Sequence, residues 1–124
     1  MSRFLFCYGS LKQSFAVQDE LGIRHSLRFI EEAKMEGKLY DLGDYPALIA
    51  GKGTVHGEIF EILDDQVFAI LDQYEGYDPK SPETSLYVRE LTCCAERLVW
   101  VYVFQEDLRF AERLVGGLWP REST

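Results

Sequence analysis

The chain has 124 residues, which is enough for one hydrophobic core and too few for two, so we expect residues 1–124 to form a single domain. Hydrophobic residues make up 47% of the sequence and charged residues 27%, a balance that excludes an intrinsically disordered chain. The 13 Lys and Arg against 21 Asp and Glu give a net charge of −8, which argues against nucleic acid as a partner.

The sequence also indicates the cellular compartment in which the protein acts. No apolar stretch approaches the ~20 residues that span a bilayer, and the apolar run at residues 4–8 is too short for a signal peptide. Of the three cysteines, Cys93 and Cys94 are neighbours, an arrangement that fits disulfide geometry poorly. We therefore expect a cytoplasmic protein with no membrane segment, acting as a monomer or weak dimer.

The first elements in chain order are a strand and a short helix. Residues 4–8 are apolar at every position, which suits a central strand buried on both faces. Ser14 is a candidate N-cap for a short helix that ends near Gly22.

Three shorter segments follow. Residues 39–43 indicate a strand that runs into a turn, and residues 45–49 a short edge strand, because Pro46 cannot donate a hydrogen bond to a ladder. A tight connection at residues 51–53 leads into a strand over residues 55–62. Within it, a glycine at position 57 predicts a bulge or a close backbone approach.

The clearest helix begins after Asp64 as a candidate N-cap and ends at Gly76. It carries an apolar stripe at helical spacing, formed by Val67, Phe68, Ile70, Leu71 and Tyr74.

The last third of the sequence predicts a loop at residues 78–84, followed by strands at residues 86–93 and 97–104. A short helix is then predicted at residues 107–114, before a Gly116-Gly117 turn. Many short strands with few helices indicate an α+β fold built on a curved sheet that closes or nearly closes into a barrel. The sequence does not alternate strands with long helices, which disfavours a Rossmann fold.

The turn Tyr8-Gly9-Ser10-Leu11 is the first candidate site. Consecutive backbone N–H groups in a glycine turn after a buried strand can converge on a carboxylate or an oxyanion. The alternative is an ordinary turn that ends a strand.

Glu75 is the second candidate. It lies at the end of the clearest helix beside Tyr74 and Tyr77, where burial would raise its pKa toward that of a useful general base. A carboxylate near a helix C-terminus is disfavoured by the helix dipole, which favours a functional reason for it. The alternative is a solvated carboxylate at a helix end.

The late strands carry Tyr87, Arg89 and Tyr102, of which the first two share one face. Arg89 could bind a substrate carboxylate or pair with Asp72, and we favour the structural role. No Cys-x-x-Cys or His-x-x-x-His spacing occurs, so we expect no metal and no cofactor. Cys7 is more typical of a core residue than of a nucleophile.

Six blocks in the same order resemble the γ-glutamylcyclotransferase-like superfamily. They are Tyr8-Gly9-Ser10-Leu11, Gly37-x-Leu39-Tyr40-Asp41-Leu42-Gly43 with Tyr45-Pro46-Ala47-Leu48, Val55-x-Gly57-Glu58-Ile59-Phe60, Leu71-Asp72-x-Tyr74-Glu75-Gly76, Tyr87-x-Arg89 and Val101-Tyr102-Val103-Phe104.

The resemblance implies a small mixed-strand barrel flanked by short helices. It also implies that Tyr8, Gly9, Ser10 and Leu11 cradle a γ-glutamyl group, with Glu75 as the acid and base that drives its cyclisation to 5-oxoproline. We predict Tyr87 and Tyr102 as further substrate-binding residues. Two alternatives remain open: a binding module without turnover, and a related amide-cleaving acyltransferase that acts on a γ-glutamyl metabolite.

Overall fold

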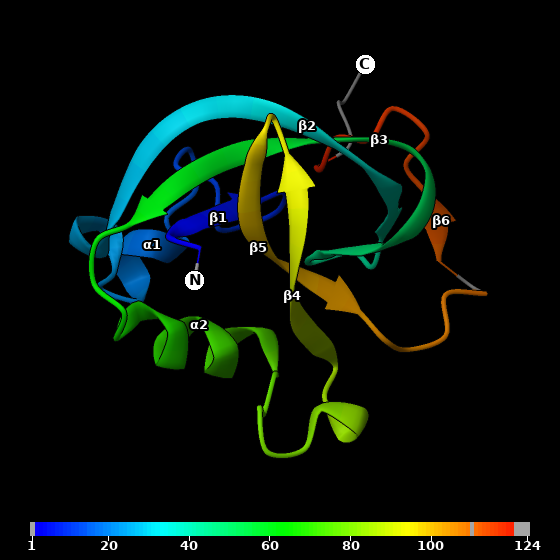
Figure 1. Cartoon of the computed structure of the whole chain (residues 1–124). Coiled ribbons are helices and arrows are strands. Elements are labelled where there is room, and N and C mark those ends of the chain that lie inside the picture. The colour runs from blue at the N-terminus through cyan, green and yellow to red at the C-terminus, as the bar shows by residue number, and fades with distance from the viewer. Residues whose placement is uncertain (1, 110, 121–124) are drawn as a thin grey trace.

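The computed structural model describes residues 2–109 and 111–120, which form a six-stranded sheet in the order β4-β5-β1-β3-β2-β6. The sheet curls into a half-barrel with short helices beside it (Figure 1), as expected from the α+β pattern. The elements, in chain order, are β1 (Phe4–Cys7), α1 (Val17–Glu20), η1 (Arg24–Ser26), β2 (Leu27–Asp41), β3 (Pro46–Ile62), α2 (Val67–Glu75), η2 (Pro82–Thr84), β4 (Tyr87–Cys94), β5 (Arg97–Phe104) and β6 (Glu112–Arg113).

Strand β1 occupies the middle of the sheet, which confirms the prediction of a central strand. It pairs antiparallel with β3 and parallel with β5, where Leu5 lies opposite Trp100. Leu5, Phe6 and Cys7 are buried, because both faces of β1 are covered. Gly57 on β3 marks a close approach, since a Cβ there would lie 2.5 Å from the Cys7 carbonyl oxygen.

Strands β2 and β3 form one long hairpin, so the predicted tight connection at residues 51–53 is wrong. The strand predicted at residues 45–49 is present from Pro46, but as the first part of the long strand β3 and not as a separate short edge strand. Strand β3 runs through both segments, and Pro46 is its first residue, where a missing N–H is tolerated. Residues 50–53 form an irregularity in the pairing, because Glu36 lies opposite Thr54 whereas Lys38 lies opposite Ile49. Gly51 and Gly53 permit the additional bend of β3 at this irregularity.

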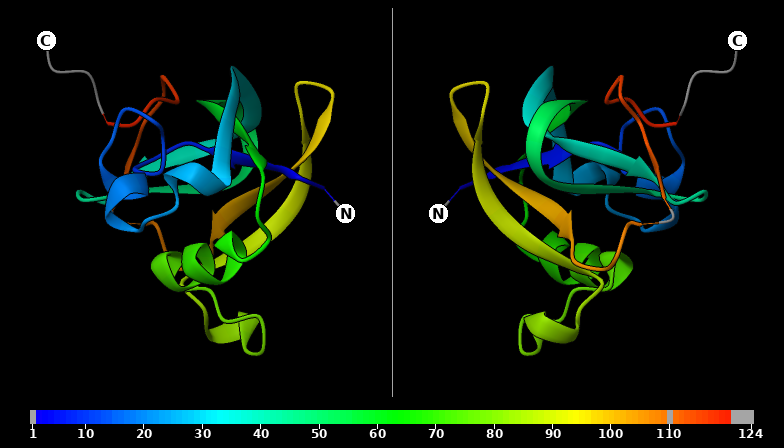
Figure 2. Two further views of the ribbon diagram at one scale, coloured as in Figure 1. Left: turned by 90° about the vertical axis from the view of Figure 1, so that its left-hand side faces the viewer. Right: turned by 90° about the vertical axis from the view of Figure 1, so that its right-hand side faces the viewer.

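Helix α2 forms where the sequence predicts it and ends at Gly76, which has the left-handed φ of 73° typical of a helix C-terminus. Val67 and Leu71 are buried, but Ile70 and Tyr74 are 39% and 42% exposed, so only part of the predicted apolar stripe faces the core. The helix lies across one end of the curved sheet, with η2 projecting beyond it (Figure 2). None of the helices in the described ranges has the length and hydropathy to cross a membrane.

Two predicted helix caps are wrong. The N-cap of α1 is Ala16 and not Ser14, and the helix is a single turn. The N-cap of α2 is Gln66, although the Asp64 carboxylate accepts the Gln66 N–H at 3.0 Å in the turn just before it. Ser14 lies too far ahead of the first helical residue to act as a cap, whereas Asp64 caps only the turn that precedes α2.

Strands β4 and β5 confirm the predicted late hairpin. Cys94 lies opposite Arg97, so the connection is the two-residue turn of Ala95 and Glu96, both of which have positive φ angles, 52° and 65°. Such a turn matches the twist of an antiparallel pair.

The predicted helix at residues 107–114 is wrong within the described residues, because the chain there follows the edge of the sheet. Strand β6 pairs with β2, and the Leu114 N–H donates to the Leu39 carbonyl oxygen at 2.8 Å. The Gly116-Gly117 turn is confirmed by a 2.8 Å bond from the Gly117 N–H to the Leu114 carbonyl oxygen.

Candidate active site

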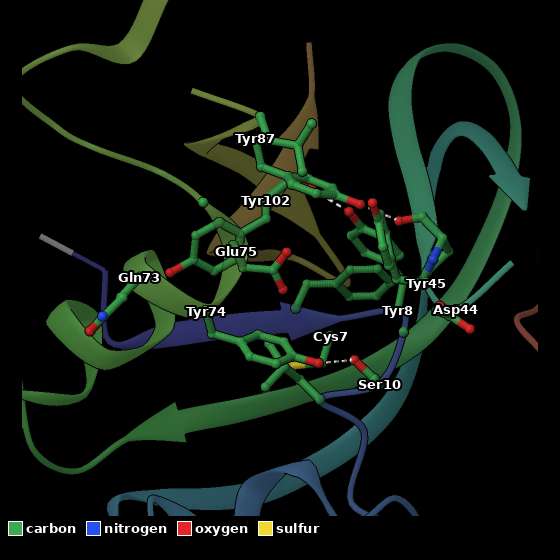
Figure 3. Close-up of a pocket in the computed structure, with 16 residues that line it drawn as sticks. Cys7, Tyr8, Ser10, Asp44, Tyr45, Gln73, Tyr74, Glu75, Tyr87 and Tyr102 are labelled. Atoms are coloured by element: carbon green, nitrogen blue, oxygen red, sulfur yellow. Dashed lines mark hydrogen bonds between the residues drawn. The ribbon is translucent and has the colours of Figure 1, made fainter. Parts of the chain in front are cut away.

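A cavity of about 370 Å³ opens where the end of β1, the start of β3, the end of α2 and the β4-β5 hairpin meet (Figure 3). Every residue predicted as catalytic or substrate-binding lines it, as do several that were not predicted. The lining residues are Phe6, Cys7, Tyr8, Gly9, Ser10, Leu11, Asp44, Tyr45, Pro46, Gln73, Tyr74, Glu75, Gly76, Leu86, Tyr87 and Tyr102.

The turn after β1 forms one wall of this cavity. The Lys12 N–H donates to the Gly9 carbonyl oxygen at 3.1 Å, which closes the turn around Ser10 and Leu11. Within the described ranges, no protein acceptor takes the N–H groups of Ser10 and Leu11. A Cβ on Gly9 would lie 2.7 Å from Pro46 Cγ, so this position needs glycine because β3 packs behind the turn.

Glu75 is the last residue of α2, and its carboxyl group points into the cavity toward Tyr8, between Tyr87 and Tyr74 (Figure 3). No other described residue donates a hydrogen bond to this carboxyl group. Burial raises the pKa of Glu75 from 4.5 to about 7, which confirms the expected direction. The group can therefore both take up and release a proton near neutral pH.

Tyr77, expected to help bury Glu75, does not line the cavity. Its ring lies against the guanidinium group of Arg89 instead, 5.8 Å from the guanidinium carbon to the ring centre.

The side chains of three buried tyrosines, Tyr8 among them, form a further wall of the cavity, the tyrosine wall. Tyr8 donates its hydroxyl proton to the Tyr102 carbonyl oxygen at 2.5 Å, Tyr87 to the Pro46 carbonyl oxygen at 2.6 Å, and Tyr102 to Asp72 Oδ1 at 2.7 Å. Burial raises the pKa of each phenol, reinforced by the nearby Glu75 carboxylate for Tyr8 and Tyr87 and by the hydrogen bond to Asp72 for Tyr102. They therefore stay neutral, and the lone pairs of their oxygens remain available to a donor on a ligand.

A hydrogen bond crosses the mouth of the cavity. Ser10 Oγ and the Tyr74 hydroxyl lie 2.8 Å apart, linking the turn after β1 to the end of α2 (Figure 3). Both groups are exposed to solvent, so a ligand can replace this bond without leaving a buried polar atom unpaired.

Arg89 has the structural role that the sequence favours. Its Nε and Nη2 atoms donate to the two Asp72 carboxylate oxygens at 2.9 and 3.1 Å, and its guanidinium carbon lies 4.3 Å from the Phe68 ring centre and 4.6 Å from that of Trp100. It does not line the cavity. The pair ties α2 to β4 one helical turn before Glu75, and so helps to place that carboxyl group.

Part of the cavity comes from residues without a local signal in the sequence. Asp44, Tyr45 and Pro46 enter from the β2-β3 turn, and Gln73 and Leu86 complete the rim. Tyr45 and Pro46 belong to one of the six sequence blocks that resemble the family. Their place in the same cavity as Glu75 follows from the β2-β3 hairpin and is not evident from the sequence.

Cys7 lies in the floor of the cavity. Burial raises the pKa of its thiol well above the ordinary value, which supports a core role over a nucleophilic one. All three cysteines are free. Over residues 2–109 and 111–120, no group of three or more His, Cys, Asp or Glu side chains is placed to hold a metal ion.

The chain matches the family described as gamma-glutamyl cyclotransferase, AIG2-like, over residues 5–121. A relative from Vibrio cholerae is 31% identical over 120 residues, which cover 96% of both chains. The gamma-glutamylcyclotransferase family protein YtfP of Escherichia coli is 28% identical over 116 residues, covering 93% of this chain and 94% of YtfP. The solution structure of YtfP gives a TM-score of 0.74 over 94% of this chain and 96% of that chain. A mouse AIG2-like protein shares the fold with a TM-score of 0.63, at 23% identity over 82% of this chain and 76% of that chain.

Proposed function

The chain belongs to the γ-glutamylcyclotransferase, AIG2-like family, and we propose that it cyclises the γ-glutamyl group of a small γ-glutamyl amide to 5-oxoproline. The free amine or amino acid on the other side of the amide is released. One observation carries the proposal. The Glu75 carboxyl group, with a pKa of about 7, lines the same small cavity as the turn of residues 8–11.

The nucleophile of this reaction belongs to the substrate. Glu75 takes a proton from the α-ammonium group, and the freed amine attacks the γ-carbonyl carbon to close a five-membered ring. The bond from that carbon to the leaving nitrogen then breaks while Glu75 returns the proton. The α-nitrogen gives up two protons in all and the leaving nitrogen gains two, so no co-reactant is consumed.

The turn of residues 8–11 supplies hydrogen-bond donors. The N–H groups of Ser10 and Leu11, which no described acceptor occupies, can bind the substrate carboxylate or the oxyanion that develops on the γ-carbonyl oxygen. Donors already fixed by the closed turn need no reorganisation during the reaction, and they hold the reacting ends of one substrate together.

The tyrosine wall shapes the substrate site. Tyr8, Tyr87 and Tyr102 are rigid, neutral and bonded to the protein, so they exclude water around Glu75 and leave a phenol oxygen to accept from the α-ammonium group. A cavity of about 370 Å³ matches a small metabolite in size. We further propose a cytoplasmic, single-domain protein that acts as a monomer or weak dimer and binds no nucleic acid.

The test is a screen of γ-glutamyl amides, scored for release of 5-oxoproline and of the free amine. We expect stoichiometric release of both products from at least one substrate. Binding without product would indicate a binding module, and release of the amine with glutamate or a new γ-glutamyl conjugate would indicate an acyltransferase. Either result would overturn the proposal.

A further inference from the structure

Residues 11–13, which run from the end of the substrate-binding turn, are fixed by hydrogen bonds that are buried or partly buried. The Leu11 carbonyl oxygen accepts from Gln18 Nε2 at 2.7 Å, Lys12 Nζ donates to the Trp119 carbonyl oxygen at 2.5 Å, and the Gln13 N–H donates to Glu58 Oε1 at 2.7 Å. Leu11 lines the cavity, and Lys12 and Gln13 follow it directly along the chain.

The side chains that make these bonds are more deeply buried than is usual for their types. Gln18 is 1% exposed, Glu58 8% and Lys12 9%. Burying a charged side chain is unfavourable, and neither Lys12 nor Glu58 is in an ion pair with N···O of 4.0 Å or less in the described part of the chain. None of the three lines the active cavity, so the proposed chemistry does not use them.

The bonds also come from separate parts of the fold. Gln18 lies on α1, Glu58 on β3, and Trp119 on the segment after β6. On the other side of the turn, Gly9 is pressed against Pro46. The turn is therefore held at both ends, and its N–H groups have little freedom to reorient.

We infer that Glu58 is a positioning residue for the substrate-binding turn, acting through the Gln13 N–H, with Lys12 and Gln18 as supporting anchors. This inference rests on the proposed function of the turn. A hydrogen bond from a backbone N–H to a carboxylate is strong, and it fixes the chain three residues beyond Ser10. Donors held in this way bind an anion without first being ordered.

Two variants separate positioning from simple stability. Glu58→Gln keeps an oxygen that can accept from the Gln13 N–H, whereas Glu58→Leu keeps much of the volume and removes the acceptor. We expect Glu58→Leu to raise KM by about tenfold with kcat within about threefold, and Glu58→Gln to restore most of the loss. Val99→Ala, at a fully buried position away from the cavity, is the control for lost stability and should leave KM unchanged.

A second readout does not depend on turnover. Amide hydrogen exchange at Lys12, whose N–H closes the turn through its bond to the Gly9 carbonyl oxygen, should be faster in Glu58→Leu than in Glu58→Gln and the parent protein. Equal exchange in all three, or an unchanged KM in Glu58→Leu despite faster exchange, would overturn the inference. If the parent protein cyclises no γ-glutamyl amide, the proposed function fails, and the exchange rates alone decide whether Glu58 positions the turn.

Discussion

The raised pKa of Glu75 has a consequence for stability that needs no knowledge of the substrate. The ordinary pKa of 4.5 applies to the unfolded chain, whereas the folded protein holds the proton up to about pH 7. Between these two pH values the folded state binds more protons than the unfolded state, so the free energy of unfolding falls as the pH rises. Above pH 7 the full cost of burying the carboxylate is present.

The magnitude follows from the two pKa values. A rise from 4.5 to about 7 corresponds to about 3 kcal/mol, at about 1.4 kcal/mol for each tenfold change in the ionisation constant. Gln has nearly the shape of protonated Glu and cannot ionise. Glu75→Gln should therefore unfold like the parent protein near pH 4.5 and be more stable than it by up to about 3 kcal/mol at pH 8.

Urea unfolding at pH 4.5, 6 and 8 measures this difference. Glu83→Gln changes an exposed carboxyl group on η2 and is the matched control, expected to unfold like the parent protein at all three pH values. A stability gain in Glu75→Gln that does not grow with pH, or a loss at pH 8, would refute the assignment of a desolvated carboxylate in the cavity.

Three further substitutions test the surroundings of the site. Asp72→Asn replaces an acceptor of Arg89 by a donor, and should cost about 1–3 kcal/mol in a urea melt while kcat changes less than about threefold; a larger loss of kcat at full folding would show a chemical role. Gly9→Ala places a Cβ 2.7 Å from Pro46 Cγ, so we expect a stability loss of about 1–3 kcal/mol and weaker substrate binding in calorimetry; parent-like affinity would contradict this. Ser10→Ala removes an exposed hydroxyl and should raise KM only about two- to fivefold, whereas a loss of kcat would implicate it in the chemistry.

Local patterns predict those parts of the fold that local interactions determine. Helix α2 has helical spacing and a glycine at its end, and β1 is apolar at every position, so both are recognisable without the rest of the chain. The sequence predicts strands at both ends of β3 but not its continuity, because the two glycines at residues 51 and 53 are typical of a turn. They instead permit a bend in β3, which pairs with β2 on both sides of it, through residues 46–49 and 54–62. A short window of sequence does not reveal that long-range pairing.

In the candidate active site, too, local features of the sequence were predictable and long-range contacts were not. Glu75 and the turn after β1 stand out because each has an unusual local feature, a carboxylate at a helix end and a glycine turn after a buried strand. Asp72 was expected to be structural, and its bonds to Arg89 and Tyr102 confirm this. Glu58 was not singled out as a site residue, because its partner is a backbone N–H of a residue 45 positions away.

The central claim, that Glu75 carries the proton in a cyclisation reaction, is tested most directly by the turnover of Glu75→Gln. The measurement is 5-oxoproline release at saturating γ-glutamyl amide, with folding checked by a thermal melt and Glu83→Gln as the matched control. We predict that kcat falls at least ~10²-fold while KM changes little, because Gln can hydrogen-bond the substrate but cannot take its proton. Parent-like turnover in Glu75→Gln, on a substrate that the parent protein cyclises, would contradict the mechanism.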